Sequence, residues 1–124
     1  MKKKRPKHLA LYQIKLPLPG VVSIFHRISG LLLFLALPLL LLMLQESLRS
    51  ATSYAGLAEL LKTPLARLAM LGLLWAFLLH FCAGLRYLAI DAHFLKSLKQ
   101  ARESSKVVLI ASLLLTLLIG VRLW

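Results

Sequence analysis

Residues 21–44 read VVSIFHRISGLLLFLALPLLLLML, an apolar run that becomes rich in leucine towards its end. A helix needs about 20 such residues to cross the hydrocarbon of a bilayer, and this run is long enough. Two further apolar runs occupy residues 64–94 and 106–123. The sequence therefore predicts an all-α membrane protein with three transmembrane helices.

The composition agrees with a membrane location. Hydrophobic residues make up 60% of the 124 residues, and the mean hydropathy is +0.82. A soluble domain of this size could not bury so much apolar surface in its own core. The formal net charge of +12 comes from Lys and Arg residues that cluster at the ends of the apolar runs, where anionic lipid headgroups lie. We therefore expect membrane lipid, and no nucleic acid, as the surrounding partner.

The other segments connect the spans. Residues 1–20 form a basic segment with several prolines, which is expected to lie at the cytoplasmic membrane surface or on a partner. Residues 21–124 form the transmembrane domain. Within it, residues 45–63 are expected to include a short interfacial helix. Thr63 is then the predicted cap of the second span, with Pro64 as its first helical residue.

The basic residues also predict the orientation. The first 20 residues carry many Lys and Arg residues and no acid, and residues 95–106 are basic as well. Residues 45–63 balance acidic against basic side chains. Because cytoplasmic loops carry the excess of Lys and Arg, the amino terminus is expected to be cytoplasmic and the carboxyl terminus outside. The expected location is the bacterial inner membrane, as a multi-pass protein.

Polar residues in the first span need an explanation, because ionisable groups are costly in hydrocarbon. Ser23, His26, Arg27 and Gly30 are spaced i, i+3, i+4 and i+7 and therefore share one helix face. One interpretation is a polar rim in which Arg27 reaches the headgroups. That rim accounts for Arg27 but not for a hydroxyl and an imidazole on the same face, so a functional stripe is the alternative.

The second span raises the same question at His80, which lies deep among apolar residues. A neutral histidine that is hydrogen-bonded to another helix is one interpretation. The other is a haem iron ligand, with Gly84 leaving room for a flat macrocycle. Tyr87 and Asp91 continue this face, and Arg86 and Asp91 approach the inner end, where an ion pair or a contact with a propionate is conceivable.

Small residues recur along the third span at spacings of seven, four and four: Ser105, Ser112, Thr116 and Gly120. Such a stripe lets another helix approach closely, and we expect it to need a packing partner from outside the chain. The polar segment before this span ends in two serines, and Ser104 or Ser105 is the predicted cap of the third helix.

Two motifs carry a family resemblance. Residues 23–30 read SIFHRISG and residues 80–91 read HFCAGLRYLAID, and Arg5-Pro6 precedes both. Together they resemble the signatures of the cytochrome b membrane-anchor subunit of succinate dehydrogenase, respiratory complex II. The resemblance covers nearly the whole chain. It implies a haem b-binding anchor that helps to reduce quinone, either ubiquinone or menaquinone, without succinate chemistry of its own.

The resemblance also assigns residues. It implies that Ser23 and Arg27 bind quinone, and that His80 is an axial ligand of the haem b iron. A hydroxyl and a guanidinium suit the first role, since both can donate to a quinone oxygen as negative charge develops on it. The residues expected around the haem and its propionates are His26, Arg27, Gly84 and Arg86. The roles of Tyr87 and Asp91 stay open.

The implied partners are a flavoprotein subunit, an iron–sulfur subunit and a second small membrane subunit. A low-spin b-type haem generally takes two axial ligands, and His80 is the one well-buried candidate here. His8 lies in the basic tail, and His26 and His93 lie near the inner ends of their spans. The second membrane subunit is therefore expected to supply the other ligand, so that the two anchors form a heterodimeric bundle.

The sequence departs from the family pattern at a few positions. Tyr87 stands where the family usually has histidine, Ile90 where an aromatic residue is common, and His93 where a small residue is usual. Lys7 follows Arg5-Pro6 where an apolar residue is typical. Two rival functions remain open at this point: the anchor of a quinol:fumarate reductase, and a structural or pore-forming membrane protein without a cofactor.

Overall fold

The computed structural model describes residues 15–123, which form four α-helices and no strand. Arg5-Pro6, Lys7 and His8 lie outside the described residues. The helices are α1 (Leu18–Arg49), α2 (Ala51–Lys62), α3 (Pro64–Asp91) and α4 (Leu98–Leu123). Of these, α1, α3 and α4 are long and apolar enough to cross a membrane. The prediction of an all-α protein with three transmembrane helices is confirmed.

Helix α1 is longer than the predicted span of residues 21–44. Its 32 residues begin at Leu18, directly after Pro17, whose extended backbone serves as the N-cap. Pro19 lies in the first turn, where a missing N–H breaks no intrahelical bond. The helix continues through Pro38 to Arg49. Most of its large apolar side chains are exposed, as expected for a surface in contact with lipid or with another subunit.

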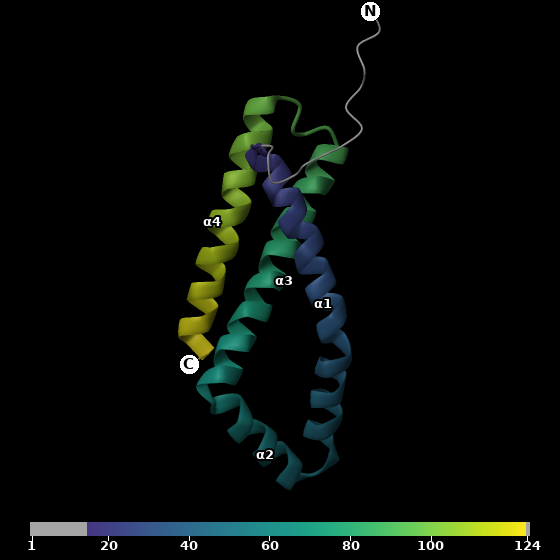
Figure 1. The fold of residues 1–124 in the computed structure, drawn as a ribbon, viewed down its shortest axis with the longest axis vertical. Helices are drawn as coiled ribbons and strands as arrows, with labels where there is room; N and C mark the ends of the chain where they lie inside the picture. Colours follow the sequence, from purple (N-terminus) through teal and green to yellow (C-terminus); the bar gives the residue numbers. More distant parts are fainter. Residues whose placement is uncertain (1–14, 124) are drawn as a thin grey trace, which may run out of the picture.

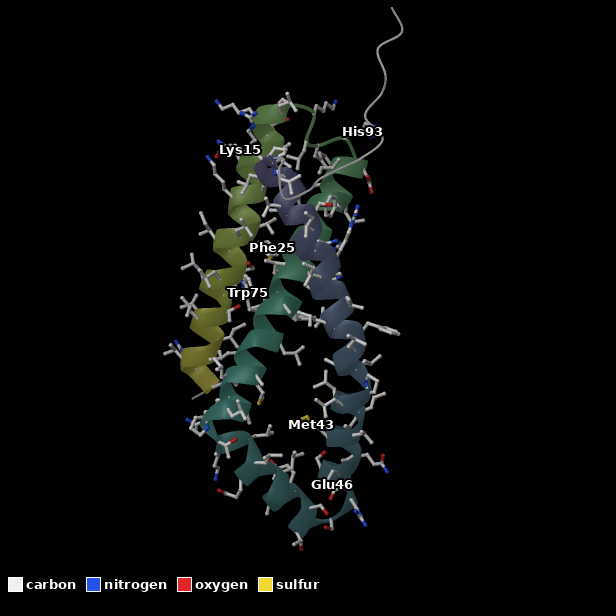
Figure 2. All side chains as sticks on the ribbon, viewed as in Figure 1. Lys15, Phe25, Met43, Glu46, Trp75 and His93 are labelled. Carbon is white, nitrogen blue, oxygen red and sulfur yellow. The ribbon has the colours of Figure 1, made fainter. Side chains whose placement is uncertain are left out.

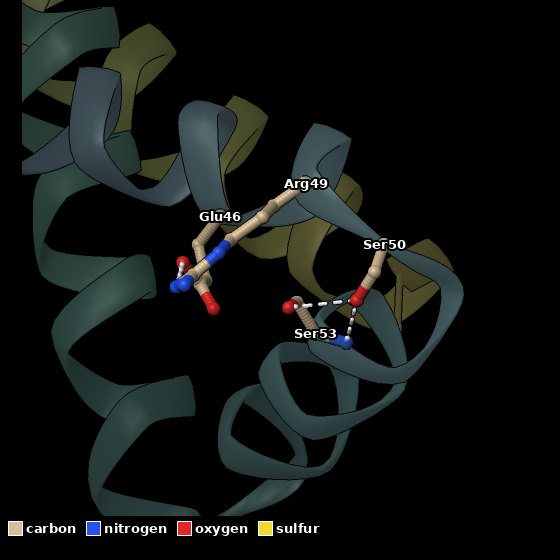
Figure 3. A network of polar contacts seen from close by, with 4 residues as sticks. All are labelled: Glu46, Arg49, Ser50 and Ser53. Carbon is tan, nitrogen blue, oxygen red and sulfur yellow. Dashed lines mark hydrogen bonds and ion pairs between the residues drawn. The ribbon is translucent and has the colours of Figure 1, made fainter.

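The predicted short helix between the first two spans exists as α2, which lies between the ends of α1 and α3 (Figure 1). The Ser50 hydroxyl oxygen accepts a bond from the Ser53 N–H at 3.0 Å and lies 2.9 Å from the Ser53 hydroxyl (Figure 3). The neighbouring Arg49–Glu46 pair at 3.5 Å is exposed and contributes little. The predicted start of the second span is confirmed, because Thr63 Oγ1 accepts from the Ala66 N–H at 3.4 Å.

Helix α3 ends at Asp91, three residues before the predicted end of the span at Phe94. The Phe94 N–H donates to the Ala89 carbonyl at 3.0 Å, and the His93 N–H donates to the Ile90 carbonyl at 2.9 Å. This pair of bonds is a Schellman motif, which requires a left-handed residue just past the cap. His93 fills that position with φ of 61°, so a histidine stands where glycine would be unstrained.

The predicted start of the third helix was wrong. Helix α4 begins at Leu98 rather than near Lys106. Ser97 Oγ accepts from the Gln100 N–H at 3.1 Å, while Gln100 Oε1 accepts from the Ser97 N–H at 3.0 Å. This reciprocal capping box starts the helix two turns early. Ser105 therefore lies inside α4, fully buried, with its hydroxyl bonded to the Ala101 carbonyl at 2.7 Å.

The small residues of α4 pack inside the chain. Ser105 and Ser112 are fully buried, and Thr116 is 6% exposed. A Cβ atom placed on Gly120 would lie 2.7 Å from Leu71 Cδ2 of α3. The expectation that this stripe needs an outside partner was wrong, because these residues are already buried within the chain, with Gly120 against Leu71 of α3.

The three long helices run side by side, with α3 between α1 and α4 (Figure 1). Val22, Ala83 and Val108, one from each long helix, form a small core near the end that carries Lys15 and His93. Glu46 and the α2 segment lie at the opposite end (Figure 2). The start of the described chain and the α3–α4 connection thus share one end of the bundle, which the charge pattern requires if both are cytoplasmic.

Candidate functional site

Two histidines from different helices meet near the core. The ring of His26 in α1 stacks on the ring of His80 in α3, with centroids 4.2 Å apart and planes 12° from parallel. From the sequence, His26 was placed near the inner end of its span and not opposite His80. The structure brings the two imidazoles into direct contact.

The Nδ1 atom of His80 is held by α1. It lies 3.0 Å from the backbone carbonyl oxygen of His26 and 3.3 Å from Ser29 Oγ. The Ser29 hydroxyl in turn donates to the same carbonyl at 2.9 Å. Because a carbonyl oxygen can only accept, the proton of a neutral His80 resides on Nδ1. The lone pair of Nε2 is then available to an outside partner.

Two glycines shape the space around these rings. A Cβ atom on Gly30 would lie 2.9 Å from His80 Cε1, so only glycine lets the imidazole sit against the α1 backbone. A Cβ atom on Gly84 would lie 3.8 Å from His26 Nε2, which is ordinary contact. Gly84, predicted to leave room for a macrocycle, lies beside the His26 ring in this structure.

The two predicted quinone-binding residues precede this pair on α1. Ser23 is partly exposed and Arg27 is exposed, whereas Val22 and Ser29 of the same helix are buried. The hydroxyl and the guanidinium are therefore accessible from outside the three-helix bundle. A pocket that uses them needs a further wall from another molecule.

Arg86 does not join the histidine pair. Its side chain is buried at 6% exposure, its Nε donates to Ser104 Oγ at 3.0 Å, and its Nη2 donates to the Ala101 carbonyl at 3.2 Å. It therefore ties α3 to α4. The ion pairs within residues 15–123 involve Glu46, Glu59 and Glu103, so the pair of Arg86 with Asp91 considered from the sequence does not form. Asp91 is exposed at the end of α3.

Tyr87 also packs on His26, with ring centroids 5.2 Å apart and planes at 52° to each other. The Arg86 guanidinium also lies 5.4 Å from the Tyr87 ring centre. The Tyr87 hydroxyl is buried and has no hydrogen-bond partner within the described part of the chain. Tyr87 therefore belongs to the histidine cluster, and its hydroxyl has no acceptor among residues 15–123.

The roles of Ser29 and Gly30 beside His80 were not predicted from the sequence. Ser29 is 4% exposed and bonded to His80, and Gly30 contacts the same ring. The sequence feature that could have indicated them is their spacing. Ser29 and Gly30 are small residues three and four positions after His26, and therefore lie on the same face of the helix. The spacing alone does not identify the partner, which is the His80 ring of α3.

Comparison with known proteins adds independent findings. The family model for the succinate dehydrogenase/fumarate reductase transmembrane subunit matches residues 1–119. The succinate dehydrogenase cytochrome b556 subunit of Coxiella burnetii (strain RSA 493 / Nine Mile phase I) is 38% identical over 125 residues, which span both chains completely. That of Paracoccus denitrificans is 32% identical, covering 90% of this chain and 84% of the relative.

A third protein of the same name, from Rickettsia felis (strain ATCC VR-1525 / URRWXCal2), is 31% identical and covers 95% of this chain and 92% of its own. These matches extend across all three spans and both motifs. The resemblance inferred from the motifs at residues 23–30 and 80–91 is thereby confirmed. The chain belongs to the family of succinate dehydrogenase/fumarate reductase transmembrane subunits, with the cytochrome b subunits of succinate dehydrogenase as its relatives.

Proposed function

We propose that this chain binds haem b in the membrane part of a succinate:quinone oxidoreductase, anchors its iron–sulfur and flavoprotein subunits, and forms part of the quinone site. The observation that carries the haem assignment is the bond from His80 Nδ1–H to the His26 carbonyl. Iron-binding histidines are usually fixed in this way, with the other ring nitrogen free for the metal. The names of the relatives, cytochrome b556 subunits, agree with a b-type haem.

The haem would be held by His80 Nε2, and when bound it supplies a one-electron redox centre. His26 is a poor candidate for the second ligand. The lone pair of an imidazole nitrogen lies in the ring plane, so two rings stacked face to face at 4.2 Å cannot both direct a lone pair at one iron between them. His93 is exposed beyond the end of α3. A second small membrane subunit is the proposed source.

Quinone binding is assigned to Ser23 and Arg27. Ser23 is partly exposed and Arg27 is exposed, and both lie in the first ten residues of α1. Lys15, just before this helix, lies at the same end of the bundle as His93 (Figure 2). The hydrogen-bond donors of Ser23 and Arg27 would hold a quinone carbonyl and stabilise the charge that develops there on reduction. This end suits electrons that arrive from an iron–sulfur subunit on the cytoplasmic side. Ubiquinone and menaquinone present the same carbonyl groups to these donors.

The membrane is proposed to be the bacterial inner membrane, with the amino terminus in the cytoplasm. A reporter fused after Trp124 is expected to be active only outside the cytoplasm. Activity of that fusion inside the cytoplasm would contradict both the orientation and the side of the quinone site. A reporter inserted in the polar segment at residues 95–97 serves as the matched control with the opposite expectation.

The haem assignment is tested in the complete complex, expressed with the neighbouring subunits. The wild-type complex is expected to show a low-spin b-type spectrum, and His80→Leu is expected to abolish or alter it. His93→Asn is the matched control, because it removes an exposed imidazole and tolerates the left-handed backbone. A complex without haem, or an unchanged spectrum in His80→Leu, would contradict the proposal and favour an anchor without a cofactor.

The chain expressed alone is expected to bind haem weakly or not at all, because one axial ligand is missing. Co-expression with the second membrane subunit should restore the low-spin spectrum. A homogeneous bis-histidine haem in this chain alone would contradict the shared ligation. It would leave His80 in place as one ligand.

A further inference from the structure

Ser29 and Gly30 lie next to the His80 ring, although neither can reach an iron bound at Nε2 through its own side chain. We propose that both are positioning residues for the His80 imidazole: Ser29 as a second acceptor for the Nδ1–H group, and Gly30 as the gap that admits the ring. The proposal rests on the function proposed for His80. It adds that residues of α1 orient the imidazole of His80, the proposed iron ligand on α3.

Ser29 is well placed for this role. Its hydroxyl proton is committed to the His26 carbonyl at 2.9 Å, so its oxygen presents a lone pair to His80 Nδ1 at 3.3 Å. The side chain is 4% exposed, and little water is present to compete in a membrane-spanning helix. Two oxygens from α1 therefore face the same N–H group. Together they oppose rotation of the ring and migration of the proton to Nε2.

Ser47 of the same helix shows what a serine does without this partner. Its hydroxyl donates to the Leu44 carbonyl at 2.7 Å, which is the same within-helix bond that Ser29 makes to His26. Ser47 lies at the other end of α1 and bonds no ring. The difference between the two serines is the imidazole of α3, so Ser47 is a matched control.

Gly30 positions the His80 ring because it has no side chain that would occupy the space of the ring. A Cβ atom there would lie 2.9 Å from Cε1 and 3.3 Å from Nδ1 of His80. Real Cβ atoms do not approach that closely, and the His80 ring is also in stacking contact with the His26 ring. An alanine at position 30 must therefore displace the imidazole. Gly72 of α3 has no atom within 4 Å of its Cβ position and gives the matched control.

The chemical consequence concerns the strength of the ligand. A hydrogen bond from Nδ1–H to an oxygen increases the electron density that the imidazole can donate through Nε2. More donation stabilises the oxidised iron relative to the reduced iron. Loss of the Ser29 acceptor should therefore raise the midpoint potential of the haem, and a displaced ring should alter the ligand field as well.

The first test uses the full-length chain without haem, labelled with ¹⁵N-histidine, with the His80 signals assigned by their loss in His80→Gln. Wild type is expected to show the Nδ1–H tautomer. Ser29→Ala and Gly30→Ala are expected to increase the Nε2–H population, whereas Ser47→Ala and Gly72→Ala leave it unchanged. Ser29→Thr keeps the hydroxyl and should restore the wild-type tautomer. Equal tautomer populations in wild type, Ser29→Ala and Gly30→Ala would overturn the proposal.

The second test uses the complete complex and measures the haem midpoint potential and the electron paramagnetic resonance of the ferric iron. Ser29→Ala is expected to raise the potential, and Gly30→Ala to shift the resonance, with both matched controls unchanged. If haem is present but neither variant alters the potential or the resonance, positioning is contradicted while the haem function stands. If the tautomer responds but the wild-type complex holds no haem, positioning stands and the proposed function is contradicted.

Discussion

Helices α1 and α4 each carry a stripe of small and polar residues, and the two stripes have different uses. In α4 the Ser112 and Thr116 hydroxyls bond to carbonyls of their own helix at 3.0 and 2.7 Å, and their outer sides pack on a neighbour. In α1 the Ser29 hydroxyl bonds its own helix and also meets a ring nitrogen of α3. The stripe on α4 packs the helices together, whereas the stripe on α1 orients the His80 imidazole of α3.

The comparison teaches how to separate the two uses. Both stripes look alike in sequence, since small side chains permit close approach in either case. A stripe whose hydroxyl groups hydrogen-bond only within their own helix, as Ser112 and Thr116 do, contributes to packing. A stripe whose polar atoms reach a titratable or accessible group on another helix can support binding. Substitutions in the α4 stripe should therefore lower the stability of the fold, whereas substitutions in the α1 stripe should alter the properties of the bound group.

The largest expected effect is on quinone reduction. Arg27→Leu should lower the rate about 10²-fold, since the loss of one donor to developing negative charge costs about 10²–10³ in rate, and Ser23→Ala should lower it less. Both rates are measured with quinone and, separately, with a soluble dye that accepts electrons from succinate oxidation. The dye reaction should be intact in both variants. Equal loss of the two activities would indicate failed assembly, and unchanged quinone kinetics in both would remove the site.

The next effect is on the packing of α4. Gly120→Leu should destabilise the folded chain by about 1–3 kcal/mol, the usual cost of overpacking, because a Cβ atom there already lies 2.7 Å from Leu71 Cδ2. Thermal unfolding in detergent measures the loss. Gly72→Leu, which enters open space, is the control. A haem spectrum that changed in Gly120→Leu more than in Ser29→Ala would contradict the division between the two helices.

A smaller gain in stability is expected at the end of α3. His93→Gly should stabilise the folded chain by about 1 kcal/mol, because glycine removes the left-handed strain that other residues bear at about 1–2 kcal/mol. The relevant φ is 61°. His93→Ala, which keeps a Cβ atom, should give no such gain. Destabilisation by His93→Gly would mean that the imidazole makes a contact outside residues 15–123.

The smallest effect concerns the Tyr87 hydroxyl. Tyr87→Phe should leave the stability of the isolated chain unchanged or raise it by up to about 1 kcal/mol, because a buried donor without an acceptor is unfavourable and this one has none within the described residues. Thermal unfolding of the isolated chain and of the complex gives the two values. A loss of stability in the isolated chain would show that the hydroxyl already has an acceptor there.

Sequence alone determined the helical class, the three spans, the family and the two motifs. These features are local: length and hydropathy decide whether a helix can span lipid, and Thr63 with Pro64 decides where α3 begins. Local reasoning failed at α4, where the Ser97–Gln100 capping box is also a sequence signal. The apolar run predicts a later start because it begins only after these polar capping residues.

Only the tertiary structure decided what the polar residues touch. His26 and His80 lie 54 positions apart, and no periodicity within one helix can state that their rings stack or that Ser29 meets Nδ1. The same holds for Arg86, whose partners lie in α4, and for the α4 stripe, which is buried within the chain. Periodicity gives the face of a helix on which a residue lies. The neighbour of that face depends on how the helices pack against one another, because each contact joins side chains from two separate segments.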